Sequence, residues 1–369
     1  MAPPPRIAPL DGVRGLAVLA VILYHATLFE VAAGAAGKVL LAVARFGWAG
    51  VDLFFVLSGF LITRLLAESR GAENYFRVFY ARRFLRIFPL YYVSLLFLVL
   101  VFHVGAGESL WYWLYASNVK MTLVGWPSAP LSHFWSLAVE EQYYLVWPLV
   151  VSLLSRRRLV SLCAGLVVLV PAARIGAYIS GVPEIGLYVL TPFRLDGLAA
   201  GSLLALLLLD LPNPRRYVPH GLATLCLAAL ASGMVIAFAG DALWGTPPML
   251  TLGFTSLAVA FAALVFLSIA LPGEALLPRL LEWRPLRAAG KVSYAMYVFH
   301  WPVTSALRDA GFRPAAIAPG AFGWIVYLVA LVGVVSVLAN LSWRLLEGPC
   351  LALKDRINYR YGKEDGPKG

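Results

Sequence analysis

The sequence predicts an all-α, polytopic integral membrane protein with about ten transmembrane helices and both termini in the cytoplasm. Three observations support this fold class. Hydrophobic residues make up 61% of the 369 residues, and the mean hydropathy is +0.79. Charged residues make up only 13%, about half the fraction of a soluble protein. Apolar runs of roughly 18 residues or more recur along the chain, and each can cross a hydrocarbon core about 30 Å thick.

Polar breaks between the apolar runs define the ten predicted spans in chain order. They are residues 16–33, 47–66, 85–104, 136–154, 159–180, 193–211, 221–239, 250–271, 292–307 and 321–345. The N-terminus lacks the pattern of a removable signal peptide, so the first run is expected to remain as a helix. The aromatic stretch at 109–119 is polar at both ends and is expected to lie at the membrane interface, the depth that Trp and Tyr favour.

The distribution of Lys and Arg predicts the orientation. With the N-terminus inside, 23 of the 30 basic residues fall in cytoplasmic segments, as the positive-inside rule requires. The same asymmetry accounts for most of the formal charge of +11, so no nucleic-acid partner is expected. Residues 1–356 are predicted to form one membrane-embedded domain, and the polar residues 357–369 a disordered cytoplasmic tail.

The cysteines predict neither a disulfide framework nor a metal site. Cys163, Cys226 and Cys350 lie far apart, in or beside apolar segments, and are expected to be small core residues. No H-E-x-x-H pattern or paired His/Cys spacing is present, so no metal is expected. No internal repeat of the kind found in transporters is apparent either.

Ionisable residues inside spans are costly and are therefore the first functional candidates. His25 lies in the first span, and Arg14 lies eleven residues before it at the cytoplasmic end. Eleven helical steps place the two side chains on one face, about 16 Å apart, which suits an extended substrate arm. A structural histidine and a headgroup-anchoring arginine remain the alternative.

A basic cluster precedes the third span. Arg82 and Arg86 are four residues apart and share a helix face, with Arg83 between them. Guanidinium groups bind phosphates in a bidentate manner, so these residues are candidates for a nucleotide diphosphate. Ordinary positive-inside charge is the alternative explanation.

Two acids, Glu140 and Glu141, lie about one turn into the fourth span, beside a glutamine and two tyrosines. This segment is too polar to face lipid, so it is predicted to line a site. Since adjacent helical residues diverge by about 100°, only one of the two acids is expected to point into the bundle. Compensation of the helix dipole is the alternative role.

Five further residues are assigned to a cavity or acceptor lining. Arg194 and Asp196 open the sixth span, either as a local ion pair or as a cavity wall, and His300 lies in the middle of the ninth. Ser58 beside Gly59 could equally serve helix packing. The assignment comprises Tyr24, Ser58, Arg194, Asp196 and His300. The remaining histidines, at span ends or in loops, are expected to be solvated.

Six segments in order resemble the signatures of the membrane acyltransferase 3 family. They are LDGVRGLAVLAVILYH, GVDLFFVLSGFLIT, FYARRFLRIFPLYYV, HFWSLAVEEQYYLVWP, FRLDGLAAG and YAMYVFHWP. The resemblance covers about residues 10–302 and implies transfer of an acyl group, usually acetyl, from acyl-CoA to a hydroxyl. The implied acceptor is a surface carbohydrate, a glycolipid or a secondary metabolite, and the implied location is the bacterial inner membrane.

The resemblance also implies roles for individual residues. The family's motifs map onto Arg14 and His25, onto Arg82, Arg83 and Arg86, onto Glu140 and Glu141, and onto Asp196. On this hypothesis the arginines bind the phosphates of acyl-CoA and His25 is the base, in direct transfer or through a covalent acyl intermediate. Glu140 or Glu141 would orient the imidazole or complete the proton path. A transporter for an amphipathic metabolite or glycolipid, and an envelope-assembly scaffold, remain as alternatives.

Overall fold

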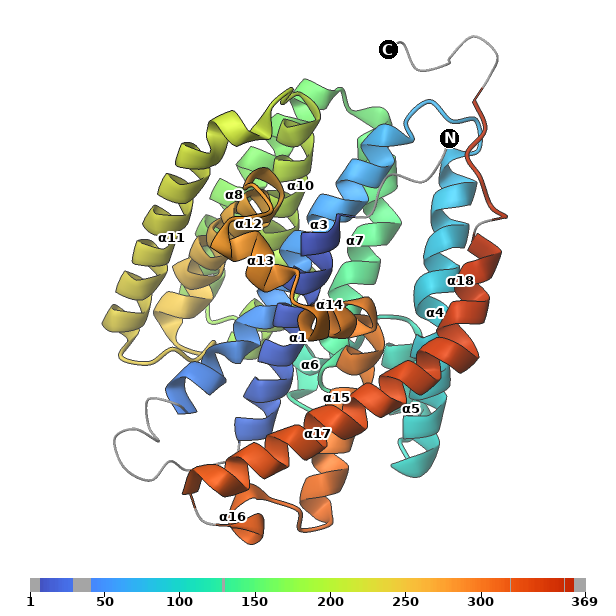
Figure 1. Cartoon of the computed structure of the whole chain (residues 1–369), viewed down its shortest axis with the longest axis vertical. Helices are drawn as coiled ribbons and strands as arrows, with labels where there is room; N and C mark the ends of the chain where they lie inside the picture. Colours follow the sequence, from blue (N-terminus) through green and yellow to red (C-terminus); the bar gives the residue numbers. More distant parts are fainter. Residues whose placement is uncertain (1–6, 29–40, 128–129, 319, 355, 362–369) are drawn as a thin grey trace.

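The computed structural model describes residues 7–28, 41–127, 130–318, 320–354 and 356–361. The described residues form helices and connecting loops and contain no β-strand (Figure 1). Each predicted span corresponds to one long helix. These helices are α1 (Ala8–Thr27), α3 (Gly50–Glu68), α4 (Tyr75–Val101), α7 (Phe134–Leu153), α8 (Arg156–Ile179), α10 (Leu195–Leu209), α11 (Val218–Ala239), α12 (Phe254–Ala270), α15 (Ser293–Asp309) and α17 (Gly320–Ser342).

Eight helical segments of the described chain are long and apolar enough to cross a membrane, which confirms an all-α, multi-pass fold. Of the ten predicted spans, α7 and α15 are the two outside this set. The first carries Glu140, Glu141 and Gln142, and the second has only 17 residues. These two helices contribute two of the acids of the site described below and several of its hydroxyl groups.

The aromatic stretch at 109–119 is not a span, as predicted. It divides between two short helices, α5 (Ala106–Trp113) and α6 (Ser117–Val124), of 8 residues each. Eight residues extend only about 12 Å, far less than the bilayer core.

Two glycines allow helices α3 and α10 to approach closely. A Cβ on Gly59 of α3 would lie 1.9 Å from the Leu198 carbonyl oxygen of α10, and one on Gly201 of α10 would lie 1.9 Å from the Val56 oxygen of α3. Helix backbones in contact at this distance exclude any side chain, which is the usual role of small residues in membrane helices. The contact fixes the position of Ser58, next to Gly59.

The segment between α12 and α15 forms two short helices that pack against the N-terminal half of α1. They are α13 (Leu276–Leu281) and α14 (Arg284–Lys291), and Figure 1 shows both in front of α1. A Cβ on Gly290 of α14 would lie 1.7 Å from the Asp11 oxygen of α1. This contact positions the helix that carries Arg14.

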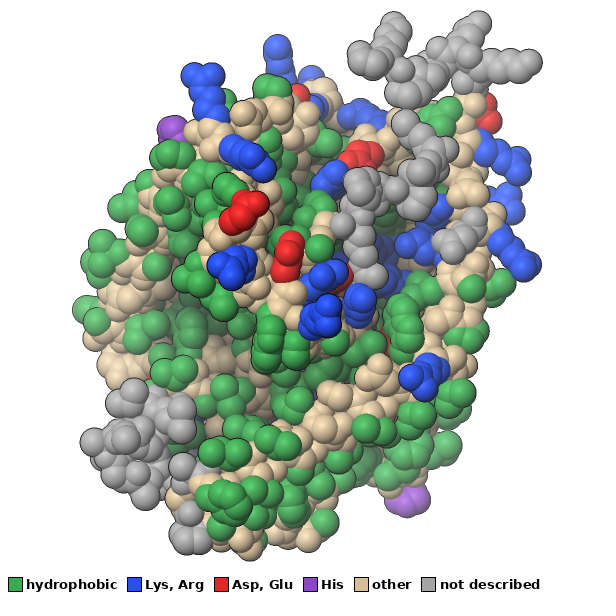
Figure 2. Space-filling view, viewed as in Figure 1, with side chains coloured by type: hydrophobic (Ala, Val, Ile, Leu, Met, Phe, Trp, Pro, Cys, Tyr) green, Lys and Arg blue, Asp and Glu red, His purple; other side chains and the backbone are tan. Residues whose placement is uncertain are grey.

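The surface separates apolar and basic regions. On the face in Figure 2, Lys and Arg side chains gather mainly over the upper half and hydrophobic side chains dominate the lower half. Helix α11 turns large apolar side chains outward, with Leu227, Leu230 and Phe238 exposed by 68%, 61% and 87%. Such a helix face suits contact with lipid.

Residues 356–361, which follow α18 (Gly348–Lys354), contact the loop before α4. Asn74 Nδ2 donates to the Asn358 oxygen at 3.0 Å, and the Arg360 amide donates to Asn74 Oδ1 at 2.9 Å. The Glu73 amide also donates to the Arg360 oxygen at 2.9 Å. We call residues 356–361 the C-terminal strap; residues 362–369 lie outside the described chain.

The prediction for the cysteines holds for one of three. Cys163 is buried in the core, whereas Cys226 is exposed and Cys350 is partly buried. Cys226 lies on the outward-turned helix α11, where a small apolar thiol can face lipid as readily as protein.

Candidate active site

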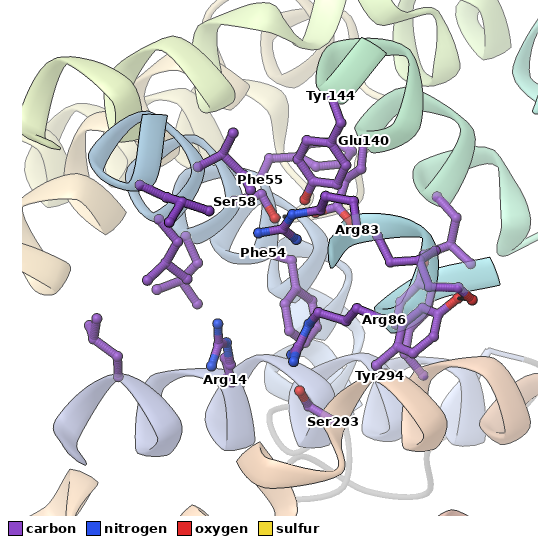
Figure 3. Close-up of a pocket in the computed structure, with 18 of the residues that line it drawn as sticks. Arg14, Phe54, Phe55, Ser58, Arg83, Arg86, Glu140, Tyr144, Ser293 and Tyr294 are labelled. Atoms are coloured by element: carbon purple, nitrogen blue, oxygen red, sulfur yellow. Dashed lines mark hydrogen bonds between the residues drawn. The ribbon is translucent and has the colours of Figure 1, made fainter. Parts of the chain in front are cut away.

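A cavity of about 340 Å³ lies between α1, α3, α4, α7 and α15. It extends from the start of α1, the end of α3 and Lys354 of α18 to Phe54, Ser136 and Tyr297 in the interior. Basic residues, acids and apolar side chains line it, and Figure 3 shows Arg83 beside Glu140. A cavity of this kind, apolar with a few convergent polar groups, is the usual form of a small-molecule site.

Basic side chains from four helices gather at one end of the cavity, which we call the mouth. Figure 3 shows Arg14, Arg83 and Arg86 extending into the same space. They are joined there by Arg64, which pairs with Glu68 at 2.7 Å, and by Lys354. Five cationic side chains thus line the mouth, and they come from α1, α3, α4 and α18.

Arg83 and Arg86 form no ion pair with a described residue within 4 Å, whereas Arg14 pairs with Asp11 and Arg64 with Glu68. The Arg83 guanidinium lies 5.0 Å from the ring centre of Tyr144, another cavity residue. Guanidinium groups that face a cavity without a carboxylate partner are available to an anionic ligand.

Arg82 does not line the cavity. Its Nε donates to the Ile357 oxygen at 2.8 Å and its Nη2 to Asn358 Oδ1 at 3.2 Å. Its guanidinium also lies 5.4 Å from the ring centre of Tyr359. The structure therefore separates Arg82 from Arg83 and Arg86, and it gives Arg82 contacts with the C-terminal strap.

Both acids of α7 line the cavity, so the expectation that only one would point inward was wrong. Ser58 Oγ donates a hydrogen bond of 2.5 Å to Glu140 Oε1. Glu141 Oε1 is buried and has no hydrogen-bond partner among the described residues.

The inner end of the cavity is closed by residues that we call the partition: Phe54, Ser136 and Tyr297. The Ser136 and Tyr297 hydroxyls are 2.6 Å apart, and each lies 3.1 Å from the His133 carbonyl oxygen, so one donates to the other and the second donates to the carbonyl. The ring of Phe54 lies 6.0 Å from that of Tyr297.

Three histidines lie together behind the partition, outside the cavity lining. His25 Nδ1 is 3.2 Å from His300 Nε2, and the His300 ring is 5.2 Å from that of His133. His300 and His133 are 0% and 2% exposed, while His25 is partly exposed. The burial of His133 corrects the expectation that it would be solvated. It caps α7 and its Nε2 reaches the Val298 oxygen at 3.0 Å.

The expected contact between an acid and the His25 imidazole is absent from the described residues. His25 Nδ1 is bonded to Val21 O and faces His300, while Glu140 is bonded to Ser58. The structure therefore places His300, rather than Glu140 or Glu141, against the His25 ring. Within the described chain, no three His, Cys, Asp or Glu residues are arranged to hold a metal ion.

Arg194 and Asp196 do not pair with each other, so the predicted local ion pair was wrong. Arg194 pairs with Asp52 of α3, and Asp196 pairs with Arg174 of α8 at 2.9 Å. All four side chains are buried, and Arg194 lies 3.9 Å from the ring centre of Phe254. These two pairs join α3, α8 and α10, and none of the four residues lines the cavity.

Of the five residues assigned to a lining, the cavity reaches only Ser58. Tyr24 lies beside His25, with ring centres 4.9 Å apart, and its hydroxyl accepts from Trp244 Nε1 at 3.2 Å. His300 belongs to the histidine cluster, and Arg194 and Asp196 belong to the buried ion pairs.

Sequence reasoning did not assign several residues that the structure places at the site. Arg64, Tyr144, Tyr297 and Lys354 line the cavity. Arg174, which lies outside the cavity, was also not assigned a role. A charged residue inside a span is itself a signal, and Arg174 carries it. Lys354 gives no such signal, since it lies near the cavity only because α18 folds back along α4.

Comparisons with known proteins add the following findings. The family model described as "Acyltransferase domain" matches residues 7–340. The chain is 31% identical over 93% of its length to a putative peptidoglycan O-acetyltransferase, YrhL, of Bacillus subtilis. It is 28% identical over 97% of its length to the peptidoglycan O-acetyltransferase OatA of Listeria monocytogenes, and 28% identical over 94% to the O-acetyltransferase OatA of Staphylococcus aureus.

The chain spans little more than half of these relatives, covering 54%, 58% and 57% of their lengths. The similarity therefore concerns the part of each relative that corresponds to this membrane-embedded chain. No solved structure was found to match the chain.

Proposed function

Because the chain belongs to the acyltransferase family whose model it matches over residues 7–340, we propose that it transfers an acyl group from acyl-CoA to a hydroxyl. The acyl group is acetyl, and the acceptor is a hydroxyl-bearing carbohydrate or glycolipid of the bacterial cell envelope. The relatives named as peptidoglycan O-acetyltransferases support this acceptor class. The bacterial cytoplasmic membrane is the location that such an acceptor requires.

The observation that carries the proposal is the pair of unpaired guanidinium groups at the cavity mouth. Coenzyme A carries a diphosphate and a 3′-phosphate at one end of a long, weakly polar arm that ends in sulfur. Arg83 and Arg86 offer the charge for the phosphates, with Arg14 beside them. The apolar walls toward Phe54 suit the arm, and the acids near Ser58 lie where the thioester would arrive.

The mouth faces the cytoplasm in this proposal, since it lies where α1 begins and α3 ends. Acyl-CoA is a cytoplasmic metabolite, so the basic end of the cavity meets the compartment that supplies the donor. The predicted inside location of the segment at 64–86, which contains Arg64, Arg83 and Arg86, agrees with this direction.

The proposed chemistry is general-base catalysis by His25. His25 Nε2 takes the proton of the acceptor hydroxyl as its oxygen attacks the thioester carbonyl carbon. The carbon–sulfur bond breaks, and the CoA sulfur receives a proton, so that the free thiol and the ester are the products. For the two substrates to meet, the thioester must pass the partition, and rotation of the Tyr297 or Phe54 side chain opens that route. Glu140 and Glu141 lie beside the bound donor and can accept or pass on protons there.

The direct test uses the purified full chain in nanodiscs with isotopically labelled acetyl-CoA and envelope glycan fragments. We expect labelled ester on the glycan with the wild type and at least a 100-fold lower rate with His25→Ala. Retained turnover in folded His25→Ala would rule out His25 as the base. Movement of an intact substrate across the bilayer without any ester would instead identify a transporter.

The donor site is tested separately through the arginines. We expect Arg83→Ala and Arg86→Ala each to raise the KM for acetyl-CoA by roughly 10-fold, because each removes a charge-assisted contact with phosphate. Arg77→Ala is the matched control, since Arg77 is on the same helix, is exposed and does not line the cavity. If Arg77→Ala raised the KM equally, Arg83 and Arg86 would act only through the overall positive charge of the surface and not as a phosphate-binding site.

A further inference from the structure

The histidine cluster behind the partition contains an unusual contact. Two imidazole rings, those of His25 in α1 and His300 in α15, face each other nitrogen to nitrogen at 3.2 Å. Their ring centres are 4.8 Å apart. A neutral imidazole has one N–H and one lone pair, so such a contact fixes which nitrogen of each ring carries the proton.

The protonation of His300 follows from its backbone partner. His300 Nδ1 is 2.5 Å from the Tyr297 carbonyl oxygen, and a carbonyl oxygen can only accept. Nδ1 therefore carries the hydrogen and donates it. The other nitrogen, Nε2, keeps its lone pair and points at His25, from a ring that is fully buried.

The protonation of His25 follows in turn. His25 Nδ1 lies 3.0 Å from the Val21 carbonyl oxygen and 3.2 Å from His300 Nε2. Both neighbours are acceptors, so Nδ1 carries the hydrogen and shares it between them. The lone pair of His25 is then on Nε2, which is the nitrogen that a base requires.

We propose that His300 is the positioning residue for His25: together with the Val21 carbonyl it fixes the Nδ1–H tautomer, and it stabilises the charge that develops when Nε2 accepts a proton. This inference rests on the proposed function, in which His25 is the base. When the acceptor hydroxyl gives its proton to His25 Nε2, the ring becomes an imidazolium and its Nδ1–H bond to His300 becomes charge-assisted. The proton then passes from Nε2 to the leaving CoA sulfur, and His25 returns to its neutral tautomer.

The side chains that face the two rings are aromatic or imidazole groups. The titratable groups that face the two rings are Tyr24, Tyr297 and His133, and the Trp301 ring lies 4.8 Å from His25. His133 donates through Nε2 to the Val298 oxygen, and its Nδ1 has no partner among the described residues. No carboxylate of the described chain is bonded to His25 or His300, so the neutral partner ring of His300 takes the part that an aspartate plays in serine hydrolases.

The tautomer can be measured directly by solid-state NMR of the full chain in nanodiscs, with ¹³C and ¹⁵N labels in histidine. The five histidines can be assigned by single His→Gln substitutions. We expect neutral His25 with hydrogen on Nδ1 in the wild type. In His300→Leu the Val21 oxygen is the remaining acceptor for Nδ1–H, and we expect a larger share of the Nε2–H form. Hydrogen on Nε2 of wild-type His25 would overturn the proposal, whatever the activity.

Kinetics of conservative and non-conservative variants separate positioning from folding. We expect His300→Leu to lower kcat for acyl transfer roughly 100-fold with little change in the KM for acetyl-CoA. We expect His300→Gln to recover about 10-fold, because its amide oxygen can accept from His25 Nδ1. His103→Gln is the control, since His103 is exposed and outside the cluster.

The outcomes of this pair of measurements are distinct. The proposal that His300 positions His25 would be wrong if His300→Leu lowered kcat without changing the His25 tautomer. It would also be wrong if His300→Gln recovered no activity. Full activity of His25→Ala would refute the proposed base, yet the tautomer would still report on the contact with His300. If His300→Leu does not fold, acetyl-CoA binding is lost. The proposal is then tested by the His25 tautomer in the wild-type spectrum and by the kcat of His300→Gln.

Discussion

At the scale of single residues, the site is marked by polar groups that have no partner of opposite charge or no hydrogen-bond partner. Arg83 and Arg86 line a cavity without carboxylate partners, and Glu141 Oε1 is buried without a described hydrogen-bond donor. Arrangements of this kind cost stability in the unliganded protein and are therefore typical of binding sites. By contrast, Arg174 makes four hydrogen bonds and is a structural residue.

The contact between Ser58 and Glu140 gives a prediction for the donor side of the site. We expect Glu140→Gln to lower kcat for acetyl transfer roughly 100-fold, because the amide can still accept from Ser58 but cannot take up or carry a proton. Ser58→Ala removes only one hydrogen bond, and we expect a loss of about 10-fold. Steady-state rates with labelled acetyl-CoA measure both.

The control for this pair is Glu184→Gln, an exposed acid outside the cavity. A Glu140→Gln variant as active as this control would show that Glu140 has a structural role through Ser58 alone.

At the scale of helices, close packing fixes where the site residues lie. The glycine contact between α3 and α10 brings the backbones together and holds Ser58 against α7. Buried ion pairs tie the same region to α8. Removing one member of such a pair leaves an uncompensated charge, which costs several kcal/mol, so Arg194 and Asp196 are important for the fold although they lie outside the cavity.

Alanine at Gly201 tests this packing. We expect Gly201→Ala to lower the thermal unfolding midpoint by several degrees, because the new Cβ would meet the Val56 carbonyl at 1.9 Å and must push the helices apart. Gly233→Ala is the matched control in α11, with nothing within 4 Å of its Cβ. A circular-dichroism melt in one detergent compares the two, and equal midpoints would contradict the packing argument.

The helices themselves were predictable and their mutual contacts were not. Hydrophobic length located all ten long helices, since the cost of burying polar backbone in lipid leaves few alternatives. Arg194 and Asp196, two residues apart, suggested a local pair, but each found its partner on another helix. His133 suggested a solvated loop for the same reason: one sequence does not show which helix covers a residue. The positions of Arg14, Ser58, Glu140 and Glu141 at one cavity agree with the sequence motifs, while their catalytic roles stay predictions.

At the scale of the whole molecule, the basic residues and the cavity mouth share one end. At that end, Asn74 in the loop between α3 and α4 and Arg82 of α4 are hydrogen-bonded to the C-terminal strap. Lys354 lines the cavity. The opposite end carries α5 and α6, with the ion pair between Glu108 and Lys120. The positive-inside rule assigns the first end to the cytoplasm.

Single cysteines test this orientation. In a chain with its three native cysteines replaced, we expect Glu73→Cys to react with a membrane-impermeant maleimide only after the cells are opened. We expect Gly107→Cys, at the start of α5, to react in intact spheroplasts. Both positions are exposed, so the difference depends on sidedness, and the reverse pattern would place the mouth outside.

The partition has a consequence for the energy balance of the cell. In the proposed function the cavity opens toward the cytoplasm, and a continuous proton path from it across the bilayer would dissipate the proton-motive force. Here the hydroxyls of Ser136 and Tyr297 both lie against the carbonyl oxygen of His133, and a carbonyl accepts a hydrogen bond but has no proton to pass on. With the partition closed, these hydrogen bonds therefore provide no proton relay from the cavity to the histidine cluster.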